Sequence, residues 1–247
     1  MITVVITGAA SGLGAATATY LRSLHVNVVI LDRDEDVGQK VAQQIGATFM
    51  TCDVTDDKHI QHVFSELARL AIPVRCLVNC AGVGLAQKVL SQQGVHAMND
   101  YDHVLNVHLQ GTFRCSRYAA ELMANNEPLS PDHERGVIIN TGSIAAFEGQ
   151  KGQAAYAAAK GGIVAMTLPL ARDLAQHHIR VNTICPGVFD TPFFEQIPAG
   201  IVAGLIDQSL FPKRLGKPEE FAAFVVHMIE NVMFNACVCR LDAGLRM

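Results

Sequence analysis

The stretch ITVVITGAASGLG (residues 2–14) decides the fold of this chain. It starts with six β-branched residues, which are typical of a strand, and continues through three glycines into a run of small residues that suits a helix. Gly8, Gly12 and Gly14 allow a tight turn, a close approach of the backbone to a pyrophosphate, and close packing of the helix on the sheet. The helix N-terminus then offers unpaired N–H groups and a positive dipole end to phosphates. A glycine-rich turn also suits an ordinary connection, so a dinucleotide site needs support from the rest of the chain.

The alternation of short β-branched runs with longer helical patterns continues along the chain. Several runs are apolar throughout, as expected for strands covered on both faces. Strand–helix–strand units of this kind build a parallel sheet with right-handed crossovers and helices on both faces. No linker or repeat divides the chain, so we predict one α/β domain over residues 1–247. The predicted strands are ITVVIT (2–7), NVVILD (27–32), ATFMT (47–51), VRCLVN (74–79), GVIINTG (136–142), IRVNTI (179–184) and ACVCRLD (236–242).

Composition narrows the class of protein. Half of the 247 residues are apolar and 17% are charged, which indicates a compact globular protein. The formal charge of −4 gives no basic excess for nucleic acid, and no apolar run suggests a membrane span. The N-terminus has no secretory pattern, and the seven cysteines include no CxxC, so we expect a cytoplasmic protein with buried free thiols. Because the histidines form no HExxH or similar cluster, we expect no metal.

A carboxylate follows the second strand. Asp32 lies 24 residues after Gly8, where it can accept hydrogen bonds from the adenosine ribose hydroxyls. It would also repel a 2′-phosphate, whereas the next residue, Arg33, can bind one. We weight Asp32 more heavily and predict NAD rather than NADP. The alternative is that Asp32 is only a turn residue at a strand end.

Further signals for a cofactor fall at the ends of the third and fourth strands. Asp53 and Val54, in CDVTD (52–56), could edge an adenine ring, and NCAG (79–82) brings small residues close to the cofactor. Ligands of open parallel sheets bind outside the carboxyl ends of the strands, and each of these signals lies at such an end. From these turns we predict cofactor contacts by Gly8, Ser11, Gly12, Leu13, Gly14, Asp32, Asp53, Val54, Asn79, Ala81 and Gly82.

A phenol and an ammonium lie four residues apart in YAAAK (156–160) and share one helix face. Ser143, at the end of the fifth strand, can point at the same space. The ordinary pKa of a Tyr hydroxyl, about 10, is too high for a base, and a nearby ammonium or a charged nicotinamide ring lowers it. We predict that Tyr156 exchanges a proton with substrate, that Ser143 hydrogen-bonds the same oxygen, and that Lys160 also binds the nicotinamide ribose. The alternative is a surface Tyr and Lys on an amphipathic helix.

Small residues surround this pair: Ala154, Ala155, Ala157, Ala158, Ala159, Gly161 and Gly162. They allow a cofactor, the sheet or a partner helix to approach closely. We therefore expect a homo-oligomer with this helix near an interface.

Taken in order, the motifs resemble the short-chain dehydrogenase/reductase family along the whole chain. The resemblance implies a single Rossmann-like domain with a seven-stranded parallel sheet. It also implies hydride transfer between a nicotinamide dinucleotide and an alcohol or ketone. Pro186, Gly187, Val188 and Thr191 are then expected near the nicotinamide, with Val188 or Thr191 at its carboxamide. The motifs are TGAASGLG (7–14), Asp32, CDV (52–54), NCAG (79–82), Ser143, YAAAK (156–160) and ICPG (184–187).

Four segments of the chain are similar to the type-2 3-hydroxyacyl-CoA dehydrogenases within that family. This narrower likeness implies NAD-dependent interconversion of 3-hydroxyacyl-CoA and 3-oxoacyl-CoA in fatty acid metabolism, by a homotetramer. Alternatives are a 3-oxoacyl-carrier-protein reductase, an alcohol or steroid dehydrogenase, and a non-catalytic dinucleotide-binding scaffold. A scaffold that kept the fold without the activity would be expected to lack Ser143, Tyr156 or Lys160, whereas this chain keeps all three. The segments are 135–175, NEP (126–128), FPKRLGKP (211–218) and RLDAGLRM (240–247).

Two further expectations concern the substrate and a departure from the family pattern. A stretch rich in Pro, Gly and Phe predicts a substrate lid around residues 189–215, with Phe193, Phe194 and Leu210 as candidate apolar walls.

In VLNVHLQGTF (104–113), His108 stands where the family usually has Asn. We treat His108 as a candidate member of a proton relay, and expect its replacement by Asn to leave activity unchanged or improved.

Overall fold

Seven parallel strands form the central sheet, in the order β3-β2-β1-β4-β7-β8-β9. The computed structural model describes residues 2–70, 72–129, 131–195 and 197–247, and the side chains of residues 194 and 195 lie outside the described part. The predicted seven-stranded parallel sheet is confirmed, and no strand end differs by more than two residues from the one expected. The strands are β1 (Thr3–Thr7), β2 (Asn27–Asp32), β3 (Thr48–Thr51), β4 (Val74–Asn79), β7 (Gly136–Thr141), β8 (Ile179–Pro186) and β9 (Val238–Leu241).

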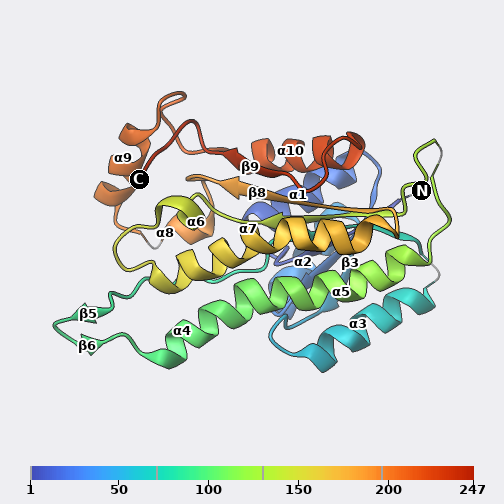
Figure 1. Ribbon diagram of the computed structural model, residues 1–247, viewed down its shortest axis with the longest axis horizontal. Coiled ribbons are helices and arrows are strands. Elements are labelled where there is room, and N and C mark those ends of the chain that lie inside the picture. Colours follow the sequence, from blue (N-terminus) through green and yellow to red (C-terminus); the bar gives the residue numbers. More distant parts are fainter. Residues whose placement is uncertain (1, 71, 130, 196) are drawn as a thin grey trace.

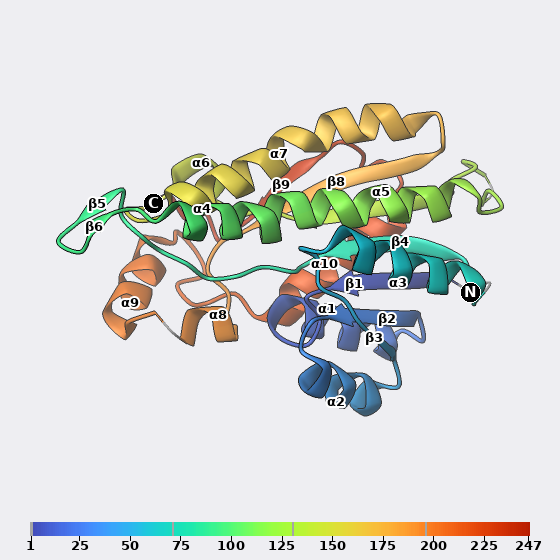
Figure 2. The ribbon, with the colours of Figure 1, turned by 90° about the horizontal axis from the view of Figure 1, so that it is seen from below.

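Helices cover both faces of this sheet (Figures 1 and 2). Because side chains alternate along a strand, Val5 of β1 packs towards one helical layer, whereas Val4 and Ile6 pack towards the other. All three are fully buried, which explains why β1 is apolar throughout. One layer comprises α3 (Asp57–Arg69), α5 (Gly111–Ala124) and α7 (Ala154–Ala175), and the other α1 (Gly12–Ser23), α2 (Glu35–Ile45) and α10 (Pro218–Glu230).

The short elements gather at one end of the molecule, where the strands have their carboxyl ends (Figure 1). One of them is a small hairpin, in which Leu90 and Ser91 pair with Gly94 and Val95. These elements are β5 (Leu90–Ser91), β6 (Gly94–Val95), α4 (Met98–Leu105), α6 (Ala145–Glu148), α8 (Pro192–Glu195) and α9 (Ala199–Gln208).

A π-helical turn, η1 (Asn106–Gln110), joins α4 to α5. Such turns insert an extra residue into a helix and occur frequently at functional sites. His108 lies in the middle of this turn and is 2% exposed. The turn therefore directs a buried imidazole to the end of the sheet, a feature that the sequence pattern does not reveal.

Helix α7 is long and apolar enough, by length and composition alone, to cross a membrane. In this fold it packs against β8 and α6, and it carries Tyr156 and the buried Lys160. A helix in the core of an α/β domain passes the same test.

Candidate active site

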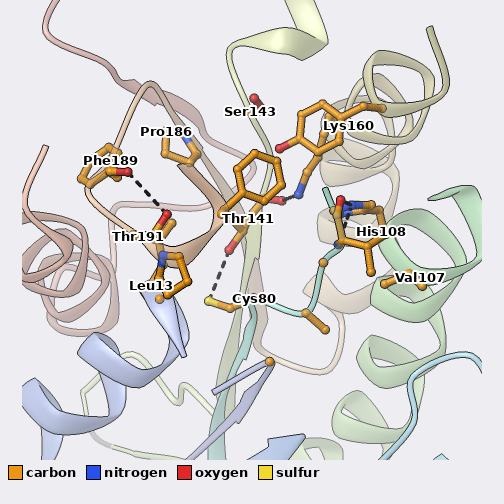
Figure 3. Close-up of a pocket in the computed structure, with 18 of the residues that line it drawn as sticks. Leu13, Cys80, Val107, His108, Thr141, Ser143, Lys160, Pro186, Phe189 and Thr191 are labelled. Atoms are coloured by element: carbon orange, nitrogen blue, oxygen red, sulfur yellow. Dashed lines mark hydrogen bonds between the residues drawn. The ribbon is translucent and has the colours of Figure 1, made fainter. Parts of the chain in front are cut away.

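A cavity of about 790 Å³ opens at the carboxyl ends of the strands, as expected for an open parallel sheet. Residues from the glycine turn, from the ends of β2, β4, β7 and β8, and from α7 line the same space. The structure thus brings the predicted cofactor residues and the predicted proton-handling residues together, with Asn79 as the exception (Figure 3).

Asn79 does not line the cavity. As the last residue of β4 it lies on the same face as Leu77, towards α5, because side chains alternate along the strand. Its Nδ2 donates to Asn140 Oδ1 at 2.9 Å and to Ser116 Oγ at 3.2 Å, and the side chain is almost fully buried. The prediction that Asn79 contacts a cofactor is therefore corrected: its side chain ties two strand ends to α5.

The glycine turn leaves no room for side chains at two positions. Gly8 has φ +65°, and a Cβ there would lie 2.5 Å from the Cα of Ala81. A Cβ on Gly14 would lie 2.4 Å from the carbonyl oxygen of Gly8, so α1 starts directly against the turn. Together they form a cradle of bare backbone at a helix N-terminus, which suits a pyrophosphate.

Asp32 is held at the edge of the cavity by backbone contacts. The N–H of Ala10 donates to Asp32 Oδ2 at 2.9 Å, and the N–H of Asp34 donates to Oδ1 at 3.1 Å. Asp32 therefore fixes the turn and also faces the cavity, and its contact with a ribose stays a prediction. Arg33 lines the same region.

Asp53 is a second carboxylate at this end of the cavity. Burial raises its pKa, but hydrogen bonds from the backbone and side chain of Thr55 lower it more, so the pKa lies below its ordinary value. The neighbouring Val54 is buried against Gly111 of α5. Asp53 is therefore charged at neutral pH, next to an apolar surface.

Ser143 and Lys160 are buried, Tyr156 is partly buried, and all three face the cavity. Burial raises the pKa of Tyr156 to about 12, although a hydrogen bond with Ser143 lowers it. The Nζ of Lys160 donates to the carbonyl of Thr141 at 2.6 Å and lies 5.6 Å from the centre of the Tyr156 ring. Burial lowers the pKa of Lys160 to about 8.

These directions correct one part of the sequence interpretation. The protein alone does not lower the pKa of Tyr156, because loss of hydration outweighs the neighbouring groups. The same burial lowers the pKa of Lys160, to a value that still leaves most of the ammonium charged at neutral pH. A positive charge brought in by a ligand would favour the ionised form of this phenol.

His108 is neutral and is wedged beside Tyr156. Its Nε2 lies 2.9 Å from the carbonyl oxygen of Val83 and 3.1 Å from the backbone nitrogen of that residue, so it can donate to the first or accept from the second. The imidazole meets the Tyr156 ring edge-on, with centroids 5.2 Å apart. Burial, and then the charge of Lys160, lower the pKa of His108 to about 3. An imidazole of this kind is poorly suited to carry protons near neutral pH, so the geometry favours a positioning role over the predicted relay.

The predicted lid region contributes the remaining walls. The Phe193 ring lies 6.1 Å from that of Tyr156, and Ile201 and Leu205 of α9 also line the cavity. Leu210 does not line the cavity, because the residue is 75% exposed and lies near Gly244. The prediction that Leu210 forms an apolar wall is therefore wrong. The side chain of Phe194 lies outside the described residues.

The sequence interpretation missed several lining residues, among them Ile144, Leu205 and Met247. Ile144 directly follows Ser143, so its position next to the site could have been inferred. Leu205 and Met247 reach the cavity only through the folding of α9 and of the segment after β9, which no local pattern announces.

The comparisons with known proteins agree with this arrangement. The family model described as short chain dehydrogenase matches residues 2–201, and the chain belongs to that family. The 3-hydroxyacyl-CoA dehydrogenase type-2 of Homo sapiens is 47% identical over 247 residues, covering 98% of this chain and 94% of that protein. The protein of the same name from Drosophila melanogaster is 41% identical and covers 98% and 96% of the two chains. The crystal structure of 3-hydroxyacyl-CoA dehydrogenase type-2 from Mycobacterium avium superposes with a TM-score of 0.91 at 36% identity, covering 100% of this chain and 96% of the other.

The family and the site define the class of chemistry. The chain is an oxidoreductase with a Rossmann-like dinucleotide fold, and the cradle of Gly8, Gly14 and Ala81 fits a nicotinamide cofactor.

Proposed function

We propose that the protein is an NAD-dependent dehydrogenase that interconverts 3-hydroxyacyl-CoA and 3-oxoacyl-CoA. The observation that carries the proposal is that Ser143, Tyr156 and Lys160 line the same cavity as the glycine cradle. The substrate class draws on relatives of 41% to 47% identity that bear the name 3-hydroxyacyl-CoA dehydrogenase type-2.

The proposed roles follow from the contacts of each side chain. When bound, NAD⁺ accepts the hydride and adds positive charge to the pocket. Tyr156 Oη takes the proton of the substrate hydroxyl, because a positive charge in this buried site stabilises the phenolate strongly. Ser143 hydrogen-bonds the same substrate oxygen, with its Oγ fixed by the N–H of Ala145 at 3.1 Å. Lys160, anchored on Thr141, presents its remaining donors to the nicotinamide ribose.

The preference for NAD is part of the proposal. It rests on the carboxylate of Asp32, which two backbone N–H groups hold at the edge of the cavity. A fixed negative charge at this place repels a 2′-phosphate and can accept from ribose hydroxyls. Arg33, which lines the same region and can bind a 2′-phosphate, is the competing influence.

A spectrophotometric assay tests the proposal. Purified protein is mixed with NAD⁺ and 3-hydroxybutyryl-CoA, the formation of NADH is followed, and NADP⁺ is run in parallel. We expect turnover that prefers NAD⁺ and disappears in Tyr156→Phe. Turnover of simple secondary alcohols or steroids without turnover of any 3-hydroxyacyl-CoA would overturn the substrate class and favour the alternative alcohol or steroid dehydrogenase.

We also propose a homotetramer in the cytoplasm that serves fatty acid metabolism. Exposed apolar side chains on neighbouring helices support self-association: Phe113 of α5 is 48% exposed and Leu168 of α7 is 44% exposed. Light scattering during size-exclusion chromatography tests the oligomer, and a monomer at micromolar concentration would contradict it. Cell fractionation tests the location.

A further inference from the structure

The chain after β9 folds back to the cavity. Figure 1 shows the C-terminal segment running to the end of the molecule that also holds α6 and α9. Leu245 is fully buried, and Met247 is one of the residues that line the cavity. This segment therefore forms part of the site, although it lies far from the other lining residues in the sequence.

A network of charged groups holds the segment in place. The Arg240 guanidinium donates to Glu148 Oε1 of α6 at 2.7 Å, to Asp242 Oδ2 at 2.6 Å and to the carbonyl of Leu245 at 2.7 Å. The backbone N–H of Met247 donates to Glu148 Oε2 at 2.9 Å. Glu148 and Arg240 are both largely buried, so these contacts are less screened than a surface pair. They tie residue 247 to the helix that directly follows Ser143 and Ile144.

Apolar side chains form a compartment around this point. Ile144, which directly follows Ser143, and Val188, which directly follows Gly187, both line the cavity that Ser143 and Tyr156 face. Leu205 of α9 and Met247 lie at the cavity as well. The cluster consists of Ile144, Val188, Leu205 and Leu245, with Leu215 and Met247 packed against it.

We propose that Ile144, Val188, Leu205 and Met247 form the compartment for the acyl chain, and that Met247 closes its end and sets the acyl length. This inference rests on the proposed function, because it names the part of the substrate that the compartment receives. A hydrocarbon tail gains most from this surface, whereas the polar thioester carrier must extend towards solvent. The unbranched side chain of Met suits an adaptable end wall.

The variant Met247→Ala tests the inference with a series of straight-chain 3-hydroxyacyl-CoA substrates of increasing length. Each buried methylene raises kcat/KM about fourfold, so in the native protein the values should rise with length and stop rising when the chain meets Met247. Truncation frees space for about three methylenes, so the optimum should move to longer chains, with a gain of about sixtyfold at the new optimum.

Two further variants make the outcome decisive. Met247→Trp should shift the optimum to shorter chains, and Met233→Ala, at an 85% exposed Met away from the cavity, should leave the profile unchanged. Profiles of Met247→Ala and Met247→Trp that parallel the native profile would overturn the inference. Should no acyl-CoA react, the proposed function fails, and the same length series is run with straight-chain secondary alcohols. An unshifted optimum in that series would overturn the compartment separately.

Discussion

Adding one methyl group at Gly82 should disturb the active site through His108. A Cβ on Gly82 would lie 2.6 Å from Cε1 and 3.1 Å from Nδ1 of His108. The imidazole would have to retreat by about 0.8 Å to reach ordinary van der Waals contact. It has little freedom to do so, because the Tyr156 ring lies at 5.2 Å and Val83 binds Nε2.

The magnitude follows from the cost of overpacking a buried site, which is about 1–3 kcal/mol. We expect Gly82→Ala to lower the free energy of unfolding by about 2 kcal/mol, and to lower kcat because Tyr156 is displaced. His108→Asn removes the Cε1 atom and keeps polar groups for Val83. In that background Gly82→Ala should cost little, which gives a coupling energy of about 2 kcal/mol between the two positions.

Denaturant unfolding of the two single variants, the double variant and the native protein measures the coupling, and kcat is measured on the same samples. Gly204→Ala is the matched control, because a Cβ at this helical position meets nothing within 4 Å. It should raise stability by up to about 1 kcal/mol. If Gly82→Ala is equally costly with and without the imidazole, the reasoning about His108 is refuted.

Three other predictions concern acid stability, Ser143 and cofactor choice. The depressed pKa of His108 stabilises the fold above the ordinary value of 6.5, and this stabilisation is lost as the pH falls towards about 3. Between pH 7 and pH about 5 the native protein should therefore lose about 2 kcal/mol of unfolding free energy that His108→Asn does not lose. Urea unfolding of both proteins across pH measures this difference. Unfolding free energies that fall in parallel with pH would contradict the prediction. Gly142→Ala places a Cβ 2.7 Å from Cys185 Sγ, directly before Ser143, so kcat should fall about tenfold and recover in part with Cys185→Ala. No recovery would argue against that contact. Asp32→Asn keeps one acceptor oxygen but removes the negative charge. The ratio of kcat/KM for NADP⁺ to kcat/KM for NAD⁺ should therefore rise about tenfold or more. An unchanged ratio would mean that Asp32 acts only as a turn residue.

The sheet could be predicted because each strand is an apolar run that both helical layers cover. Val4, Val5 and Ile6 carry that signal directly, since burial on both faces removes any polar position from the run. Most cofactor positions followed from the rule that ligands bind at the carboxyl ends of parallel strands. The same rule misplaced Asn79, because being at a strand end does not say which face the side chain occupies.

Other parts of the site depend on long-range packing and could not be read from local patterns. Met247 reaches the cavity only because Arg240 and Glu148 hold the last residues against α6. The expected lowering of the Tyr156 pKa was wrong for the protein alone, because the sequence spacing shows the nearby ammonium but not the depth of burial. The π-helical turn around His108 likewise follows from no recognisable motif in the sequence.

The most direct test of the account is Tyr156→Phe. Phenylalanine keeps the ring contacts with His108 and Phe193 and removes only the hydroxyl. Turnover of 3-hydroxybutyryl-CoA is measured together with NAD⁺ affinity and the unfolding midpoint. We predict a loss of about 10²- to 10⁴-fold in kcat, with cofactor affinity and folding retained. A folded variant that turns over within tenfold of the native rate would contradict the central claim that this phenol moves the proton.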